Sequence, residues 1–310
     1  MIELLKYCLL LFVTTTSLGF SIGLLLNSRK ITILQGHWAG FITLIVILQF
    51  WSIFLPVNWN ILFLILTLSV PGFLLLARTM PARISTQWRS LPLFTLAAVL
   101  PLVFLLYSGC KNVTWYDTPL YHLNAVRWIN DFAVVPGLAN LHERFGFNSS
   151  FLLFGAFTNI GPASGSASHI ALPYLLCITV CEMIWRATRQ GRGLGIILAV
   201  LFIPYFLDRG YSSESASLST DLSTNCIMCV AILYMTDRPT RFNLILVAGL
   251  CSLAFVFKLT AFPVLLCWGT YLVLQWLRKR DSNAYVLVLP AIILGGFAIR
   301  NVIVSGSQSW

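Results

Sequence analysis

The chain has 310 residues, of which 58% are hydrophobic and only 10% are charged, and its mean hydropathy is +0.85. A soluble domain carries about 25% charged residues, so this composition excludes a water-exposed globule of this size. The net charge of +10 does not indicate a nucleic-acid partner, because most basic residues cluster in short loops between apolar segments, where membrane topology explains them.

Ten apolar segments follow one another along the chain, and their lengths approach or exceed what a bilayer requires. Their apolar residues are continuous and do not alternate with polar ones, which predicts helices and not barrel strands. We therefore expect an all-α, polytopic transmembrane helix bundle of about ten spans, with a long outer loop that carries amphipathic helices. The expected spans are residues 4–26, 38–56, 59–77, 91–107, 170–185, 193–207, 221–236, 243–257, 262–277 and 284–304.

The spans fall into two expected parts. Residues 1–90 form N-terminal transmembrane helices, and residues 91–310 form a transmembrane core with the outer loop 108–169. The first apolar run is followed by no small-residue cleavage site, so we expect a retained helix and not a cleaved signal peptide.

The distribution of basic residues predicts which side each loop faces, because cytoplasmic loops carry an excess of Lys and Arg. Thirteen of the 20 basic residues lie in one set of alternate loops. These thirteen are Arg29, Lys30, Arg78, Arg83, Arg89, Arg186, Arg189, Arg192, Arg238, Arg241, Arg278, Lys279 and Arg280. This set is therefore expected to be cytoplasmic, which places the polar segment 108–169 and the loop 208–220 on the outer face.

The outer segment contains the first residues suited to chemistry. Asp117-Thr118-Pro119 is typical of a helix start, and the apolar spacing that follows predicts an amphipathic helix along the membrane surface. Asp117 is either the cap of that helix or a catalytic carboxylate. In the second interpretation, its neighbours Tyr116, Tyr121 and His122 complete a site that binds and deprotonates a hydroxyl group.

The histidines and Arg144 of the same segment also have alternative roles. His122 and His142 either make local hydrogen bonds or titrate within a site. A His/Asp metal cluster would lack a fixed ligand spacing, so no metal ligand and no cofactor is assigned, and a divalent metal stays open. Arg144 either pairs with the adjacent Glu143 or binds an anion.

Three further charged residues lie at the expected outer ends of later spans. Asp221 begins one span and either caps it or lines a polar cavity. Lys258 interrupts an apolar stretch, so its side chain either extends to the membrane surface or forms an ion pair with an acidic residue. Lys258 and Arg300 lie on the same face and are suited to hold a phosphate or pyrophosphate between them.

These motifs resemble those of the multi-spanning glycosyltransferases of the GT-C type. The resemblance covers about residues 90–305, and the stretch 116–150 is similar to a group of uncharacterised bacterial membrane proteins within that type. The matching motifs are Asp117-Thr-Pro-Leu-Tyr121-His122, Ser219-Thr220-Asp221-Leu222, Phe257-Lys258-Leu259-Thr260 and Arg300-Asn301.

The resemblance implies a multi-pass enzyme of the bacterial inner (plasma) membrane. Such an enzyme moves a hexosyl or pentosyl group from a polyprenyl-phosphate sugar to a glycan or lipid acceptor of the cell envelope. The expected catalytic residues are Asp117 and His122, and the expected substrate-binding residues are Tyr121, Arg144, Asp221, Lys258 and Arg300. Many members have a second acid where this chain has Thr118, and members usually continue through further spans beyond the position of Trp310, which predicts a C-terminally shortened chain.

Two other functions remain open from the residues alone. Intramembrane charges also line the pathway of a transporter or flippase for a lipid-linked or polar solute. Transporters tend to show repeated halves and broken helices at mid-depth, whereas the polar residues here gather toward one face. The third possibility is a non-catalytic subunit of surface-polysaccharide assembly.

Overall fold

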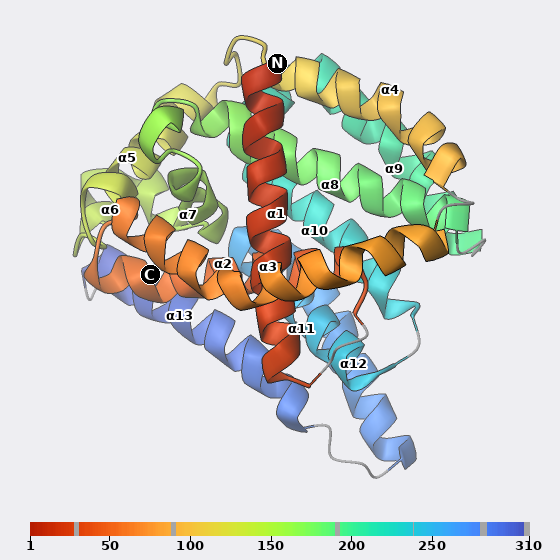
Figure 1. The fold of residues 1–310 in the computed structure, drawn as a ribbon. Coiled ribbons are helices and arrows are strands. Elements are labelled where there is room, and N and C mark those ends of the chain that lie inside the picture. Colours follow the sequence, from red (N-terminus) through yellow and green to blue (C-terminus); the bar gives the residue numbers. More distant parts are fainter. Residues whose placement is uncertain (28–30, 88–90, 190–192, 238, 280–283, 307–310) are drawn as a thin grey trace.

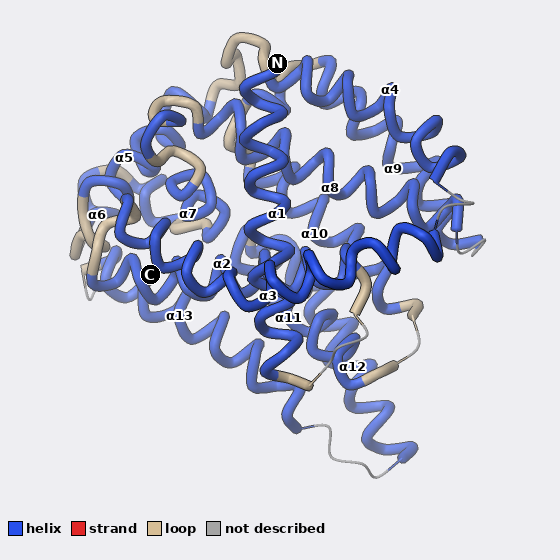
Figure 2. Tube along the Cα trace, viewed as in Figure 1, coloured by secondary structure: helices blue, strands red, loops and turns tan. Residues whose placement is uncertain are grey.

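The computed structural model describes residues 1–27, 31–87, 91–189, 193–237, 239–279 and 284–306. Within these ranges the chain consists of helices and connecting turns, without a strand (Figure 2). The all-α prediction is therefore confirmed. Several residues on which the sequence expectations drew lie outside the described ranges, namely Arg29, Lys30, Arg89, Arg192, Arg238, Arg280 and Trp310.

Each of the expected apolar segments coincides with a helix. These helices are α1 (Ile2–Leu25), α2 (Ile33–Phe54), α3 (Trp59–Gln87), α4 (Leu91–Gly109), α8 (Ala167–Arg189), α9 (Gly193–Tyr211), α10 (Thr220–Met235), α11 (Arg241–Phe257), α12 (Phe262–Lys279) and α13 (Val288–Ser305). Short elements connect α4 to α8, namely η2 (Thr118–His122), α5 (Leu123–Asp131), α6 (Leu138–Leu141), η3 (Glu143–Phe147), α7 (Ser150–Phe157) and η4 (Gly161–Ala163). Single turns η5 (Glu214–Ala216), η6 (Leu259–Ala261) and η7 (Ala284–Leu287) precede α10, α12 and α13.

Five described stretches are long and apolar enough to cross a membrane. They are Ile2–Leu25, Ile33–Phe54, Trp59–Met80, Ala167–Thr188 and Tyr285–Ser305. Four shorter apolar helices accompany them, at Phe94–Gly109, Thr220–Met235, Arg241–Phe257 and Leu259–Leu274. A helical bundle with these properties is compatible with a membrane protein.

The first three helices pack closely, with α1 running through the middle of the view in Figure 1 and contacting both α2 and α3. Glycines make this approach possible, because a Cβ at Gly40 would lie 1.7 Å from the Thr15 carbonyl oxygen, and one at Gly19 would lie 1.7 Å from that of Gly36. Small residues commonly let helix backbones meet in membrane proteins. The first three helices also share one hydrophobic core with the helices that follow α4.

The segment between α4 and α8 folds into the bundle more deeply than the sequence predicts. Every residue of α7 is buried, and α5 packs against α7. Expected as part of a polar outer loop, α7 is instead part of the core, because its sequence Ser-Phe-Leu-Leu-Phe-Gly-Ala-Phe is apolar around its whole circumference. The elements α5, α6 and α7 gather beside the C-terminal half of α13 (Figure 1).

A buried ion network joins α8 to the end of α10. Arg186 donates from Nε to Glu182 Oε1 at 2.5 Å and from Nη2 to Asp237 Oδ2 at 3.0 Å. Glu182 also accepts from the Trp38 indole at 3.1 Å and from the Tyr234 hydroxyl at 3.2 Å. Arg186, which the sequence places in a cytoplasmic loop, is therefore buried in the bundle and binds two carboxylates.

Candidate functional site

The first charged pair of the site joins two turns of the segment between α4 and α8. Arg144 in η3 donates from Nη1 to Asp117 Oδ1 at 2.5 Å, and both side chains are about one-third exposed. The Arg144 guanidinium also lies 5.2 Å from the centre of the Tyr121 ring, within reach of a cation–π interaction. The prediction that Arg144 pairs with Glu143 is therefore wrong.

Asp117 occupies the cap position of the helical turn Thr118–His122, but its side chain makes no capping hydrogen bond. The capping interpretation of Asp117 is wrong, because the carboxylate turns to Arg144 instead. His142 does make a local hydrogen bond, since its Nδ1 accepts from the Arg144 backbone N–H at 3.1 Å. For His142 the local interpretation is confirmed.

His122, an expected catalytic residue, has a buried imidazole, and neither ring nitrogen has a hydrogen-bond partner among the described residues. Its ring centre lies 4.2 Å from that of Tyr121. The pKa of His122 is lowered to about 4, mainly by burial; the negative charges of Asp117 and Asp221 oppose this shift, and the positive charges of Arg144 and Lys258 add to it. The imidazole is therefore neutral near pH 7, with one nitrogen free to donate and one free to accept.

The neighbouring Tyr121 shares this environment. Burial raises the pKa of its hydroxyl, as does the nearby negative charge of Asp117, while Arg144 opposes the shift. Tyr121 thus keeps its proton and can donate a hydrogen bond at neutral pH.

A second charged pair lies at the ends of α10 and α11. The Lys258 ammonium donates to Asp221 Oδ1, and the two side chains are 35% and 65% exposed. Ser219 caps α10, because its Oγ accepts from the Leu222 N–H at 3.3 Å. The capping interpretation of Asp221 is therefore wrong, and Lys258 finds an ion-pair partner.

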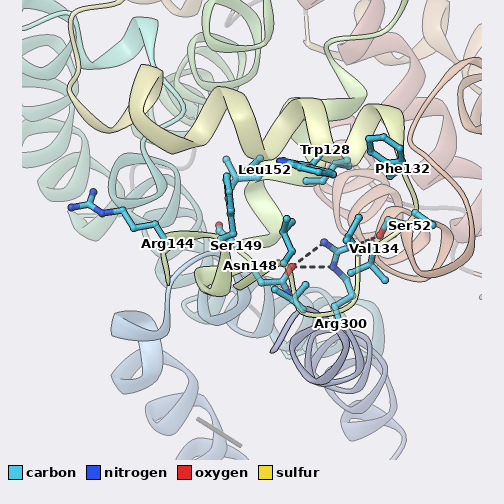
Figure 3. Close-up of a pocket in the computed structure, with 16 residues that line it drawn as sticks. Ser52, Trp128, Phe132, Val134, Arg144, Asn148, Ser149, Leu152 and Arg300 are labelled. Carbon is cyan, nitrogen blue, oxygen red and sulfur yellow. Dashed lines mark hydrogen bonds between the residues drawn. The ribbon is translucent and has the colours of Figure 1, made fainter. Parts of the chain in front are cut away.

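Arg300 lies apart from these pairs, in the wall of a small cavity of about 40 Å³ that Arg144 also lines. Its guanidinium is 4% exposed and binds Asn148 Oδ1 from Nε at 3.2 Å and from Nη2 at 2.9 Å. A further hydrogen bond runs from its Nη1 to the Ser52 hydroxyl. Figure 3 shows these bonds to Asn148, with the Arg144 guanidinium directed away from Arg300. Among the described residues, no carboxylate neutralises Arg300.

The turn at Asn148 and Ser149 connects Arg300 with the second charged pair. Asn148 adopts φ +42° and donates to Asn301 Oδ1 at 2.8 Å. Ser149 Oγ donates to the Phe257 carbonyl oxygen at 2.7 Å, next in sequence to Lys258. The sequence assigned Asn148 and Ser149 no role in the site, although an asparagine ahead of a serine and an apolar helix is a signal for a left-handed turn and a cap.

The structure thus brings six of the expected site residues together. The charges of Asp117, Arg144, Asp221 and Lys258 all influence the pKa of His122, so both pairs lie near its imidazole, which packs against the Tyr121 ring. Lys258 and Arg300, which the sequence suggests could hold one phosphate between them, have different partners in the fold: Lys258 binds Asp221 and Arg300 binds Asn148.

In the described part of the chain, no three His, Cys, Asp or Glu side chains converge as a metal-ligand group, and Asp117 and Asp221 each bind a cationic side chain instead. The cluster is suited to bind an anion, because an incoming phosphate can replace either carboxylate as the partner of Arg144 or Lys258.

Comparison with known proteins identifies a family. A family model described as a domain of unknown function (DUF8201) matches residues 1–308. The chain belongs to this family. No curated protein and no solved structure matches it.

Proposed function

We propose that this DUF8201 chain is a polytopic membrane glycosyltransferase of the GT-C type. It would transfer a sugar from a polyprenyl-phosphate donor to a glycan or lipid acceptor of the bacterial cell envelope, on the non-cytoplasmic face of the inner membrane. The observation that carries the proposal is the pairing of two acids with two cations around His122. Such a cluster provides carboxylates to accept a proton and cations to bind a phosphate.

The helix order supports the proposed membrane arrangement. If each of the ten apolar helices crosses the bilayer once, α4, α9 and α11 end on the same side. The residues of the cluster follow these three helices in the chain, as Asp117, Asp221 and Lys258. The excess of Lys and Arg in the opposite loops marks that opposite side as cytoplasmic.

The proposed reaction is an inverting transfer. Arg144 and Lys258 bind the donor phosphate, which releases Asp117 and Asp221 from their ion pairs. The acceptor hydroxyl loses its proton to Asp117 and its oxygen bonds to the anomeric carbon, while the bond from that carbon to the phosphate oxygen breaks. Polyprenyl phosphate leaves, and the cations stabilise the negative charge that develops on it. Arg300, buried behind Asn148, adds positive charge on the Arg144 side of the site.

Transfer in proteoliposomes tests the proposal. Three sets of membranes are prepared, with the wild-type chain, with Asp117→Asn, and with the control Asp208→Asn at an exposed acid in α9. Each set receives radiolabelled polyprenyl-phosphate sugars and a cell-envelope lipid extract. Loss of a general base slows a reaction by about 10²-fold or more, so Asp117→Asn should lose nearly all transfer while the control retains it. Equal transfer by the three proteins would remove Asp117 as the base. No transfer from folded wild-type protein with any donor would favour a transporter.

A further inference from the structure

A second pocket of about 340 Å³ lies on the opposite side of α5 from the Arg300 cavity. Ala125, Trp128 and Ile129 of α5 line the Arg300 cavity. The second pocket is lined by Val57, Asn58, Trp59, Leu123, Val126, Arg127, Asn130, Asp131, Asn159, Ile160, Gly161, Ser164 and Gly165. Its volume lies at the lower end of the range of about 300–1,000 Å³ that is usual for ligand sites, and its wall mixes an indole with amide and charged groups.

Trp59 forms a fixed aromatic wall of this pocket. Its side chain is 49% exposed, and its ring stacks on Phe63 with 6.2 Å between the ring centres. Gly161 packs against the indole at φ +67°, where a Cβ would lie 2.4 Å from the ring. The indole is thus held in place while part of it stays open. An aromatic ring with an open face packs well against the C–H groups of a sugar ring.

The polar part of the wall offers free charged groups. Arg127 and Asp131 are exposed and stand one turn apart on α5. In the described part of the chain, neither side chain makes a hydrogen bond or an ion pair with another residue, and both line the same pocket. They provide N–H donors and carboxylate acceptors for the paired hydroxyl groups of a sugar.

The amides around these charged groups are ordered by the fold. Asn130 donates to the carbonyl oxygens of Val57 at 2.7 Å and Ala156 at 2.9 Å, and accepts from Asn159 at 2.9 Å. Asn159 in turn accepts from the Gly165 N–H at 2.8 Å. This network holds the three segments of the wall in one geometry before any ligand binds, which lowers the entropic cost of binding.

We propose that this pocket binds the sugar ring of a carbohydrate, with its C–H face on Trp59 and its hydroxyl groups on Arg127 and Asp131. A lipid chain would leave the charged groups without partners, and a phosphate would meet the Asp131 carboxylate. Its role as the acceptor site rests on the proposed transferase function, whereas sugar binding does not.

The test measures sugar binding without any transfer. The full chain is labelled with 5-fluorotryptophan and reconstituted in nanodiscs, and the ¹⁹F resonance of Trp59 is assigned from Trp59→Phe. Methyl glycosides of glucose, galactose, mannose and N-acetylglucosamine are titrated in water, and a glucosyl diacylglycerol is incorporated in a second set of nanodiscs. The first arm detects a soluble glycan and the second a glycolipid headgroup.

We expect a saturable shift of the Trp59 resonance in at least one arm. Arg127→Gln/Asp131→Asn should weaken the apparent affinity by about tenfold or more, because charged hydrogen bonds are lost, and the control Asp208→Asn should leave it unchanged. A well-dispersed spectrum whose Trp59 resonance moves with no sugar would overturn the proposal and leave Trp59 as an interfacial anchor. An equal shift in the double variant would overturn the assigned hydroxyl contacts. Either result is independent of whether sugar transfer is observed.

Discussion

The buried imidazole of His122 makes the stability of the chain depend on pH. Burial lowers the pKa of His122 from 6.5 to about 4, so the folded state resists a proton that the unfolded state accepts. The contribution of His122 to the free energy of unfolding is therefore highest above about pH 6.5 and falls as the pH is lowered toward 4. The full contribution of this shift is about 3.5 kcal/mol, at about 1.4 kcal/mol per pKa unit. Roughly 2 kcal/mol of it is lost between about pH 7 and pH 5.

The measurement compares unfolding of the wild type and His122→Gln in mild detergent as a function of pH. Carboxylates in both proteins also titrate, so the difference between the two pH profiles isolates the imidazole. We expect His122→Gln to lose about 2 kcal/mol less than the wild type between about pH 7 and pH 5. The control His142→Gln, at an exposed histidine of the same segment, should behave as the wild type. Identical profiles for the wild type and His122→Gln would show that burial of the His122 imidazole does not make stability depend on pH.

Three further predictions concern folding. Arg186→Met should destabilise the chain by about 3–5 kcal/mol in chemical unfolding, because it leaves two carboxylates without their buried counter-ion. Gly40→Ala should lower the melting temperature through a clash between α1 and α2, whereas Gly295→Ala should not, because its Cβ meets no atom within 4 Å. Asp117→Asn should change the free energy of unfolding by less than about 1 kcal/mol, because its pair with Arg144 is partly exposed.

Each of these has a result that would count against it. A melting curve of Arg186→Met that matches that of Arg78→Met, at an exposed arginine of α3, would contradict the buried network. Equal melting temperatures for the two glycine variants would contradict the close approach of the helices. An Asp117→Asn chain that fails to fold would show that the pair contributes far more than its exposure predicts.

The helices were predictable from sequence because continuous apolar runs leave the backbone in lipid no partner except itself. The burial of α7 could not be predicted from sequence, because a short apolar run inside a polar segment has no distinctive length or period. Among the site residues, the sequence indicated the charged groups but not their partners. Arg144 lies next to Glu143 in the chain yet binds Asp117, 27 positions away, and such pairing is decided by how η2 and η3 pack together.

The role of Asn148 was also invisible, because its sequence context indicates a turn and not the neutral partner of a buried guanidinium. Arg300 itself could be singled out as a cation in an apolar helix. Its hydrogen bonds to Asn148 and Ser52 join three segments that lie far apart in sequence. These segments are α2, the turn that precedes α7, and α13.

The proposal that the charged pairs bind the phosphate of a polyprenyl-phosphate donor is tested most directly by binding of polyprenyl phosphate itself, because this measurement requires neither the sugar nor the acceptor. Native mass spectrometry of the chain with added polyprenyl phosphate would compare the wild type with Lys258→Gln and with the control Lys6→Gln, at an exposed lysine of α1. We expect saturable binding that Lys258→Gln weakens by about tenfold or more, through loss of a charged hydrogen bond, and that the control retains. Equal binding by all three proteins, or none by the folded wild type, would contradict it.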